Sequence, residues 1–248
     1  MLYAVIADVH SNLGALEAVL DDARARGATK LLDLGDSLYG PLDPAGTARL
    51  MMSPGLPSVH VRGNQDRSLV DPHADLALNR SLSFTRARLP PEALAWLAAL
   101  PLTVLVENEL RLCHGSPSSD EVYLLEAPGP NGALLRPRAD IAHLLRGSQD
   151  PVVLCAHTHL QRAVQLPGGP LVVNPGSVGS PAFADVEPLP YRVESGSPHA
   201  KYALLEKGPR GWSVNLVSVP YDHEAAAALA ALNGRDDWAW ALRTGWAS

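Results

Sequence analysis

The chain has 248 residues and a formal net charge of −6 at pH 7, and 46% of its residues are hydrophobic. This length and hydrophobic content are sufficient for a packed core without disulfides or structural metals. The acidic balance, with no basic run, argues against a protein that holds nucleic acid by its phosphate backbone. An anionic partner would have to be attracted locally rather than by the field of the whole surface.

Neither a membrane span nor a targeting signal is expected. The longest apolar stretch, 94–106, is interrupted by Pro101 and is too short to cross a bilayer. The sequence opens into the apolar run 2–6, with no basic region or cleavage site before it. Cys113 and Cys155 lie in apolar runs and are expected to be buried free thiols, with one disulfide as the alternative. We therefore expect a cytoplasmic protein.

The first third of the chain predicts strands that alternate with helices. After Asn12, apolar residues recur at helical spacing until Gly27, which predicts an amphipathic helix. The other elements expected here are strands at 2–7, 31–34 and 58–62 and a helix at 44–52. Open α/β sheets place their functional sites at the carboxyl ends of such strands.

The rest of the chain predicts mostly antiparallel strands. The expected elements are helices at 76–88 and 90–100, a hairpin of 103–107 with 110–113, a strand at 152–155, strands at 163–166 and 171–173, a hairpin of 202–206 with 212–219, and a helix at 224–232. Residues 181–199 are rich in Pro, Ser and Gly, which predicts a long surface loop or lid. A tail with Trp238, Trp240 and Trp246 is expected to dock on the body. The pattern predicts a two-layer β-sandwich flanked by helices.

Seven side chains of metal-binding type lie at or just beyond the ends of the expected strands. They are Asp8, His10, Asp36, Asn64, His114, His157 and His159. One transition metal takes about four to six ligands, and the protein seldom supplies all of them. Seven candidates therefore predict two divalent ions that share a carboxylate. Two such ions bring four positive charges and the two aspartates remove only two, which leaves a field that binds a phosphate anion.

The motifs that carry these residues run in a fixed order from residue 8 to about residue 179. They are Asp8-Val9-His10-Ser11-Asn12, Gly35-Asp36, Tyr39-Gly40-Pro41, Gly63-Asn64-Gln65-Asp66, His114-Gly115-Ser116-Pro117, Ala156-His157-Thr158-His159 and Asn174-Pro175-Gly176-Ser177. This succession resembles the calcineurin-like metallophosphoesterase superfamily. It is most similar to the small prokaryotic branch of phosphodiesterases and diadenosine-tetraphosphatase-like proteins.

The resemblance implies an α/β fold, a four-layer α/β/β/α sandwich of two mixed sheets flanked by helices. Because the sequence shows no clear domain boundary, we expect a single metallophosphoesterase domain over residues 1–248, with a C-terminal antiparallel hairpin and helical tail at about 201–248. By the resemblance, one metal would be bound by Asp8, His10, Asp36 and His159, and the second by Asp36, Asn64, His114 and His157. The ligands alone do not distinguish Mn, Fe, Zn, Co and Ni.

Further residues are expected beside the metals. Asn12, Tyr39 and Arg67 are candidates for contacts with the ligands or the substrate, although Asn12 equally suits a helix N-cap and Arg67 a surface salt bridge. Many superfamily members have a histidine after the Gly-Asn pair, where it assists the leaving group. This chain has Gln65 there, followed by Asp66, and we expect these two residues at the acid position and in its support. Glutamine donates hydrogen bonds but does not transfer a proton near pH 7, so we expect good leaving groups to be favoured.

The expected function is two-metal-dependent hydrolysis of phosphate esters, phosphodiesters first, by attack of a metal-bridging hydroxide. Two alternatives remain: a nucleotide pyrophosphohydrolase or phosphomonoesterase that uses the same site, and a catalytically weak scaffold or binding protein on this fold. The expected partner is a small phosphate ester, with nucleotides among the candidates. Substrate choice would depend on loops such as 37–44 and 181–199, and the oligomeric state stays open.

Overall fold

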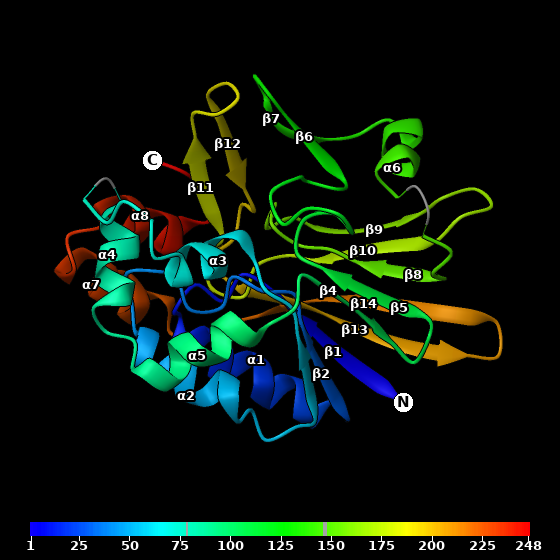
Figure 1. Cartoon of the computed structure of the whole chain (residues 1–248), viewed down its shortest axis with the longest axis horizontal. Coiled ribbons are helices and arrows are strands. Elements are labelled where there is room, and N and C mark those ends of the chain that lie inside the picture. Colours follow the sequence, from blue (N-terminus) through cyan, green and yellow to red (C-terminus); the bar gives the residue numbers. More distant parts are fainter. Residues whose placement is uncertain (78, 146–147) are drawn as a thin grey trace.

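The computed structural model describes residues 1–77, 79–145 and 148–248, which form two mixed sheets that pack face to face (Figure 1). In spatial order, the first sheet contains β14 (Gly211–Val219), β13 (Ala200–Gly208), β1 (Leu2–Ile6), β2 (Lys30–Asp33) and β3 (Ser58–His60). The second contains β4 (Thr103–Val106), β5 (Leu110–Cys113), β8 (Val152–Leu154), β10 (Leu171–Pro175) and β9 (Gln161–Gln165). With helices outside the sheets, the predicted four-layer sandwich is confirmed.

Strand β1 shows why its sequence is apolar at every position. Ala4 and Ile6 pack against the helices outside the first sheet, whereas Tyr3 and Val5 pack against the second sheet. Successive side chains of a strand point to opposite faces, so a strand covered on both sides has no polar alternation. All four of these side chains are buried, and full burial of one large aliphatic side chain contributes roughly 1.5–3 kcal/mol.

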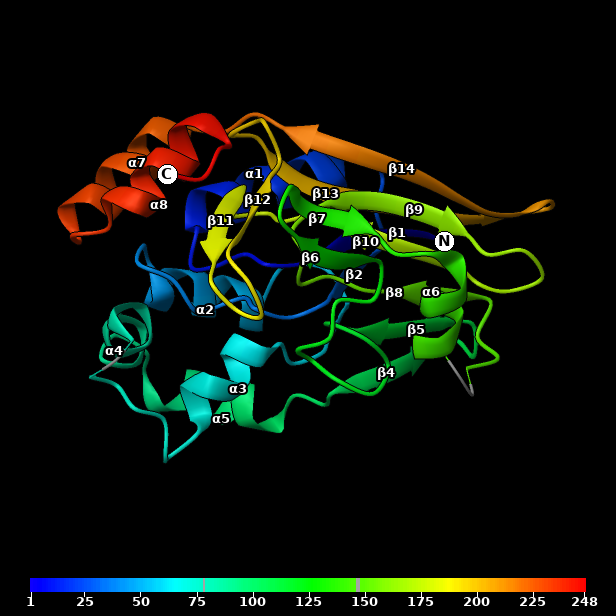
Figure 2. The ribbon, with the colours of Figure 1, turned by 90° about the horizontal axis from the view of Figure 1, so that it is seen from above.

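The two outer layers differ in size. The first sheet is covered by α1 (Leu13–Ala25), α2 (Pro44–Met52) and α5 (Pro91–Ala99), whose apolar faces join its core. The outer face of the second sheet has a smaller cover that includes α6 (Arg138–Leu144), from which Ile141 packs beside Val153 and Val172. Helices α3 (Asn64–Val70) and α4 (Arg80–Arg86) lie near α5, and α7 (His223–Leu232) packs against α8 (Asp236–Thr244) (Figures 1 and 2).

The ends of α1 follow from its sequence. The Asn12 side chain accepts a hydrogen bond from the backbone N–H of Ala15 at 3.2 Å, which caps the first turn. The helix ends after Ala25, and Gly27 follows with a φ of +86°. A side chain with a Cβ adopts this left-handed conformation less readily, which explains why the helical pattern stops there.

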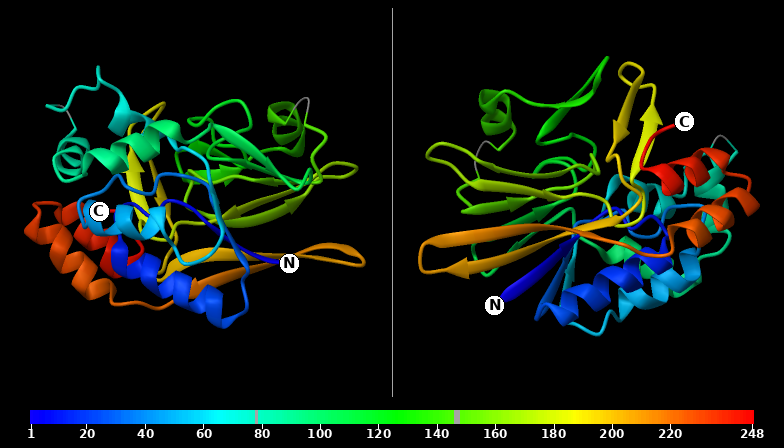
Figure 3. Two further views of the ribbon diagram at one scale, coloured as in Figure 1. Left: turned by 60° about the horizontal axis from the view of Figure 1, so that its bottom comes forward. Right: turned by 180° about the vertical axis from the view of Figure 1, so that it is seen from behind.

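The C-terminal hairpin belongs to the first sheet rather than to a separate layer. Strand β13 pairs with β1 in antiparallel register, with Leu2 opposite Glu206. Strand β14 then forms the edge, and the hairpin extends beyond β1 (Figure 3). The predicted hairpin of 202–206 with 212–219 is therefore confirmed, with both strands reaching Gly208 and Gly211 at the turn. A single domain over residues 1–248 stays a prediction.

The expectation of a long loop at 181–199 is wrong. The segment contains β11 (Ala182–Asp185) and β12 (Tyr191–Glu194), which pair with each other as an antiparallel hairpin. Tyr191 and Val193 are buried with an exposed residue between them, and both pack beside Tyr123. The high content of Pro, Ser and Gly concealed this short alternation. Close to it stands a second hairpin of β6 (Glu126–Gly129) with β7 (Gly132–Leu135), and β12 contacts β7 (Figure 2).

Four helices also differ from expectation. The helix predicted at 76–88 begins at Arg80, and residue 78 lies outside the described residues. Helices α3, α6 and α8 were not predicted, because each has nine residues or fewer and lacks a long apolar repeat. In the part of the chain that the structure describes, no helix is long and apolar enough to cross a membrane.

Candidate metal centre

The structure gathers the seven candidate ligands at one edge of the sandwich. Their positions follow the ends of β1, β2, β3, β5 and β8, whose carboxyl ends meet there. Two groups of side chains each have their ligand atoms within 4.8 Å of one another: Asp8, His10 and His159 form one, and Asp36, His114 and His157 form the other. Asn64 lines the same cleft, as its first-turn position in α3 allows.

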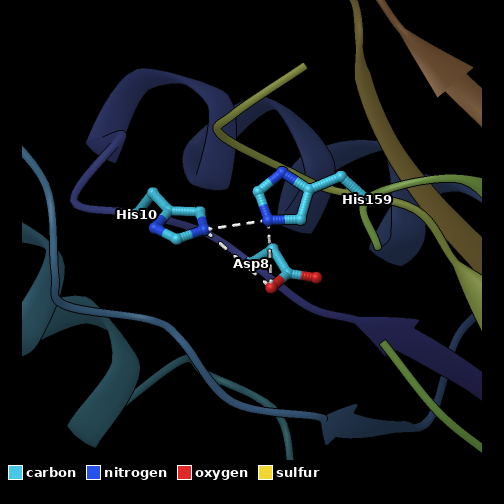
Figure 4. A group of neighbouring side chains, drawn as sticks. All are labelled: Asp8, His10 and His159. Carbon is cyan, nitrogen blue, oxygen red and sulfur yellow. Dashed lines mark hydrogen bonds and ion pairs between the residues drawn. The ribbon is translucent and has the colours of Figure 1, made fainter. Parts of the chain in front are cut away.

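In the first group, three side chains aim at one point (Figure 4). The Nε2 atoms of His10 and His159 are 3.2 Å apart. Oδ1 of Asp8 lies 3.4 Å from Nε2 of His159 and 3.9 Å from Nε2 of His10. Two imidazole nitrogens and a carboxylate oxygen in this arrangement can bind one transition-metal ion.

In the second group, His114 lies between two carboxylates. Its Nε2 is 3.3 Å from Oδ2 of Asp36 and 3.9 Å from Oδ1 of Asp8. Oδ1 of Asp8 therefore faces both groups. The other oxygen of Asp36, Oδ1, accepts backbone hydrogen bonds from Gln65 at 2.9 Å and Asp66 at 3.3 Å. The sharing of Asp36 by two ions consequently depends on Oδ2, and it stays a prediction.

The backbone is strained where it presents the ligands. Asp8, His10, Asp36, His157 and His159 have φ values of +53°, +51°, +55°, +72° and +59°. For residues with a Cβ, the left-handed region costs roughly 1–2 kcal/mol each. Such strain persists only where the surrounding structure enforces it, and it gathers at functional sites. The bends are what turn successive side chains of the Asp-x-His and His-x-His motifs toward one centre.

Two glycines make this close packing possible. A Cβ on Gly35 would lie 2.4 Å from the backbone nitrogen of Gly63, and a Cβ on Gly63 would lie 2.0 Å from Oδ1 of Asp36. Any larger residue would push the turn after β2 away from the start of α3. The Gly-Asp and Gly-Asn motifs therefore place Asp36 and Asn64 side by side for a steric reason.

Three of the four imidazoles are held in the orientation that a metal ligand needs. Nδ1 of His10, His114 and His159 lies 3.0, 2.8 and 2.6 Å from the carbonyl oxygens of Tyr39, Leu34 and Ser180. A carbonyl only accepts, so each Nδ1 carries the proton and donates it. When such a ring is neutral, its lone pair is on Nε2, which faces the candidate ligand groups.

Several buried polar atoms of the site lack a hydrogen-bond partner in the described part of the chain, and they show whether the site suits a cation. Within the described residues, Oδ1 of Asp8, Oδ1 of Asn64 and Nε2 of His114 are buried without a hydrogen-bond partner. Leaving a buried polar atom unsatisfied costs about 1–3 kcal/mol, and such atoms are few in native proteins. Three in one site, all with lone pairs or carboxylate charge, fit divalent cations. Their nitrogen and oxygen donors suit several transition metals equally.

The site also sets the charge of its histidines. Burial and the nearby His159 lower the pKa of His10 to about 4, and burial and His114 lower the pKa of His157 to about 3. Both rings are therefore neutral at pH 7, as ligands must be. Burial also acts to lower the pKa of His114, but Asp36 and Asp8 outweigh it and raise this pKa to about 10. A divalent ion would compete with that proton for the same carboxylates.

The Asp66 carboxylate holds the backbone of the loop that carries Asp36. Its Oδ2 accepts hydrogen bonds from the backbone of Asp36 at 2.7 Å and Gly63 at 3.2 Å, and its Oδ1 accepts one from Ser37 at 3.2 Å. Burial, with Asp36 and Asp33 nearby, raises the pKa of Asp66 to about 8. The side chain faces the backbone rather than the cleft, so its contacts are those of a positioning residue.

The other predicted site residues separate into two groups. Gln65 and Tyr39 line the cleft, and the Tyr39 hydroxyl donates to Oδ1 of Asn79 at 2.9 Å. Asn12 and Arg67 lie outside the cleft lining that the structure describes. Asn12 caps α1, and Arg67 donates to the carboxylates of Asp120 and Glu121 at 2.8 and 2.6 Å. The N-cap and salt-bridge interpretations therefore describe their contacts.

The cleft over the candidate ligands has a volume of about 490 Å³, and part of its wall was missed by sequence reasoning. The residues that were not named individually as site residues are Asn79, Tyr123, Phe183, Asp185, Arg235, Asp237 and Trp238. They come from segments without a recognised motif. Phe183 and Asp185 nevertheless lie within 181–199, the segment expected to influence substrate choice. The other available signal was compositional, since aromatic residues are only 5% of the chain and several gather here.

Comparison with known proteins agrees with this geometry. Residues 1–191 match the family model of the calcineurin-like phosphoesterase superfamily domain. The chain belongs to this superfamily, whose members depend on divalent metals, and it is a hydrolase that acts on phosphate esters.

Similar proteins match the chain along nearly its whole length. An uncharacterized protein of Methanocaldococcus jannaschii is 25% identical over 96% of this chain and 95% of its own. The crystal structure of a metallophosphoesterase from Sphaerobacter thermophilus has a TM-score of 0.76 at 23% identity, covering 99% of this chain and 100% of that one. A hypothetical protein from Pyrococcus horikoshii has a TM-score of 0.73 at 20% identity, covering 100% and 99%. The two structures share the fold of this chain.

Proposed function

We propose that the protein hydrolyses phosphodiesters at a centre of two divalent ions held by the seven candidate ligands. The observation that carries this proposal is the set of unpaired buried atoms, Oδ1 of Asp8, Oδ1 of Asn64 and Nε2 of His114. Asp8 belongs to one ligand group and His114 to the other, and Asn64 lines the same cleft. Two bound ions would supply a water of lowered pKa as the nucleophile and offset the charge that develops on the phosphate oxygens.

The chain contributes position and charge balance to this reaction. Carbonyl groups orient the rings of His10, His114 and His159, and Asp66 holds the backbone of Asp36. Because the imidazole and amide ligands are neutral, only the two aspartates offset the four positive charges of the ions, and two of these charges remain uncancelled. The site therefore attracts an anionic phosphate although the protein carries a net charge of −6.

Gln65 limits which esters react well. It lines the cleft, and its Oε1 is buried without a partner among the described residues. Its amide can donate a hydrogen bond to a phosphate or leaving-group oxygen, but it cannot deliver a proton near pH 7. Solvent would protonate the departing alkoxide. On this proposal the best substrates are diesters of acidic alcohols, because the alkoxide of such an alcohol can depart without full protonation.

Metal analysis and turnover test the proposal together. We expect purified protein to hold two equivalents of metal per chain and to hydrolyse bis(p-nitrophenyl) phosphate when Mn²⁺ is added. His114→Ala should lose more activity than the roughly 10–100-fold drop typical of residues behind the ligands. His73→Ala is the matched control, because His73 is exposed and outside the cleft lining as described. Circular dichroism would verify that both variants fold.

The alternatives give different results in the same assay. Less than one equivalent of tightly held metal and no turnover with any divalent ion contradict the proposal. Full metal content without turnover would favour the binding or scaffold role. A phosphomonoesterase or nucleotide pyrophosphohydrolase would prefer p-nitrophenyl phosphate or a dinucleoside polyphosphate over the diester.

A further inference from the structure

The wall that faces the candidate ligands comes from late segments of the chain. Hairpin β11–β12 contributes Phe183 and Asp185 to the cleft lining, and the α8 region contributes Arg235, Asp237 and Trp238. Strand β11 and α8 are in contact, so the two segments form one surface (Figure 1). The cleft of about 490 Å³ lies within the range of roughly 300–1,000 Å³ for sites that enclose a small molecule.

Aromatic rings border the candidate ligands on this side. The ring of Phe183 lies edge-on to His159 with centroids 4.8 Å apart, and the ring of Trp238 lies edge-on to His10 at 5.7 Å. Both aromatic side chains are partly exposed. A group joined to a phosphate at the metal centre would thus meet two rings within reach. Aromatic side chains in this setting stack on planar groups such as nucleobases, with little dependence on which base is present.

The charge of the wall is unfavourable for a second phosphate group beside these two rings. Arg235 is the one arginine or lysine in the described cleft lining. Its Nε and Nη2 donate to the Asp237 carboxylate at 2.8 and 2.6 Å, and its Nη1 donates to the Ser81 hydroxyl. Asp185 adds an exposed carboxylate. With its cation already paired and an extra acid present, the wall repels a polyphosphate chain.

From these observations we infer that the enzyme acts on phosphodiesters that join a single phosphate to a nucleoside or a similarly sized aromatic group, which stacks on Trp238 and Phe183. This inference rests on the proposed function and adds the substrate class to it. The candidate ligands would hold the ions that bind the one charged phosphate, and the wall would bind the uncharged planar group. A polyphosphate would place further charges against Asp185 and Asp237.

Two esters with the same leaving group test the inference. Thymidine 5′-(p-nitrophenyl phosphate) and methyl p-nitrophenyl phosphate each carry one negative charge and release p-nitrophenolate, so they differ only in the group that stays on phosphorus. We expect kcat/KM to favour the thymidine ester by about 10-fold or more, mainly through KM, as the loss of one base–aromatic stack would suggest. Trp238→Ala should reduce this preference several-fold.

The controls separate stacking from folding. Phe183→Leu keeps apolar bulk but removes a ring, and it should reduce the preference even if Trp238→Ala fails to fold. Trp240→Ala should keep the wild-type preference, since Trp240 is 51% exposed on α8 and outside the cleft lining as described. The inference is overturned if both esters have the same kcat/KM, or if Trp238→Ala and Phe183→Leu keep the wild-type preference. In either case, metal-dependent turnover would still support the proposed function. No turnover of either ester overturns both.

Discussion

The floor and the wall of the cleft are built in opposite ways. The floor consists of the candidate ligands at the ends of buried strands, with strained backbone and carbonyl groups that fix its imidazoles. The wall consists of a short hairpin and a C-terminal helix, with partly exposed rings and an arginine that pairs with a neighbouring carboxylate. Cation binding requires atoms held to fractions of an ångström, whereas stacking tolerates adjustment. Floor variants should therefore change whether the reaction occurs, and wall variants should change which ester reacts.

Metal removal should produce the largest effect and the clearest contrast. Chelation should abolish turnover in the wild type, and restored metal should raise the thermal unfolding midpoint. Ligand present at about 100 times its Kd stabilises the folded state by roughly 2.7 kcal/mol. His114→Ala should lose this metal-dependent rise, whereas Trp238→Ala should retain it. Differential scanning calorimetry with and without Mn²⁺ measures both. If His114→Ala still showed the metal-dependent rise in unfolding midpoint, metal binding would not distinguish the floor from the wall.

Asp66→Ala should come next, because it removes the support of the floor without removing a ligand. Three backbone N–H groups, of Asp36, Gly63 and Ser37, would lose their acceptor. Residues behind metal ligands typically cost 10–100-fold in affinity or activity, and we expect about that loss here. A buried unsatisfied group costs about 1–3 kcal/mol, so the free energy of unfolding should fall as well. Titration with Mn²⁺ and urea unfolding would show both effects.

Asp21→Ala is the matched control for Asp66→Ala. Asp21 is exposed on α1, and its ion pair with Arg24 lies at the surface. An exposed pair of this kind contributes about 1 kcal/mol or less, and metal affinity should not change. Equal metal affinity in Asp66→Ala and wild type would show that the Asp36 turn holds its shape without this carboxylate.

Gln65→His should show whether residue 65 of the floor can assist departure of the leaving group. A histidine at this position can deliver a proton, so it should help alkyl leaving groups more than p-nitrophenolate. We expect the ratio of kcat/KM for poor over good leaving groups to rise by about 10-fold, below the full 10²–10⁴ of an optimised acid. A series of diesters with graded leaving-group pKa gives this ratio as a slope. An unchanged slope would show that Gln65 does not mark the acid position.

Asp185→Lys should have the smallest effect, confined to the wall. It exchanges an exposed carboxylate at the cleft for a cation, so a polyphosphate should be tolerated better. We expect kcat/KM for diadenosine tetraphosphate to rise a few-fold relative to that for the thymidine ester, and the rise should shrink as salt is added. Glu187→Lys, on the same hairpin but outside the described lining, is the charge-matched control. If both variants changed the ratio of kcat/KM values equally, the cause would be the electrostatic field of the whole protein rather than the charge at the wall.

Most of the floor could be predicted because its residues are tied to strand ends. Asp8, Asp36 and Asn64 follow three parallel strands, and such strands end at one edge of a sheet. The orientation of the side chains was not predictable. It depends on left-handed φ values at residues such as His10 and His159, which surrounding contacts enforce. The place of Asp66 beside Asp36 was likewise decided by the contact of the first turn of α3 with the loop after β2, 30 positions apart in the chain.

The sequence by itself determined the sandwich, the superfamily and the set of residues available as ligands. Periodic burial and local motifs need only neighbouring positions to be recognised. Only the tertiary structure decided that β11–β12 and α8 close the cleft and that Phe183 and Trp238 face His159 and His10. These rings lie in short elements without a repeating pattern. Trp238 meets His10, near the start of the chain, and Phe183 meets His159, in the loop between β8 and β9. Contacts of that kind arise from how the layers pack, which no local pattern records.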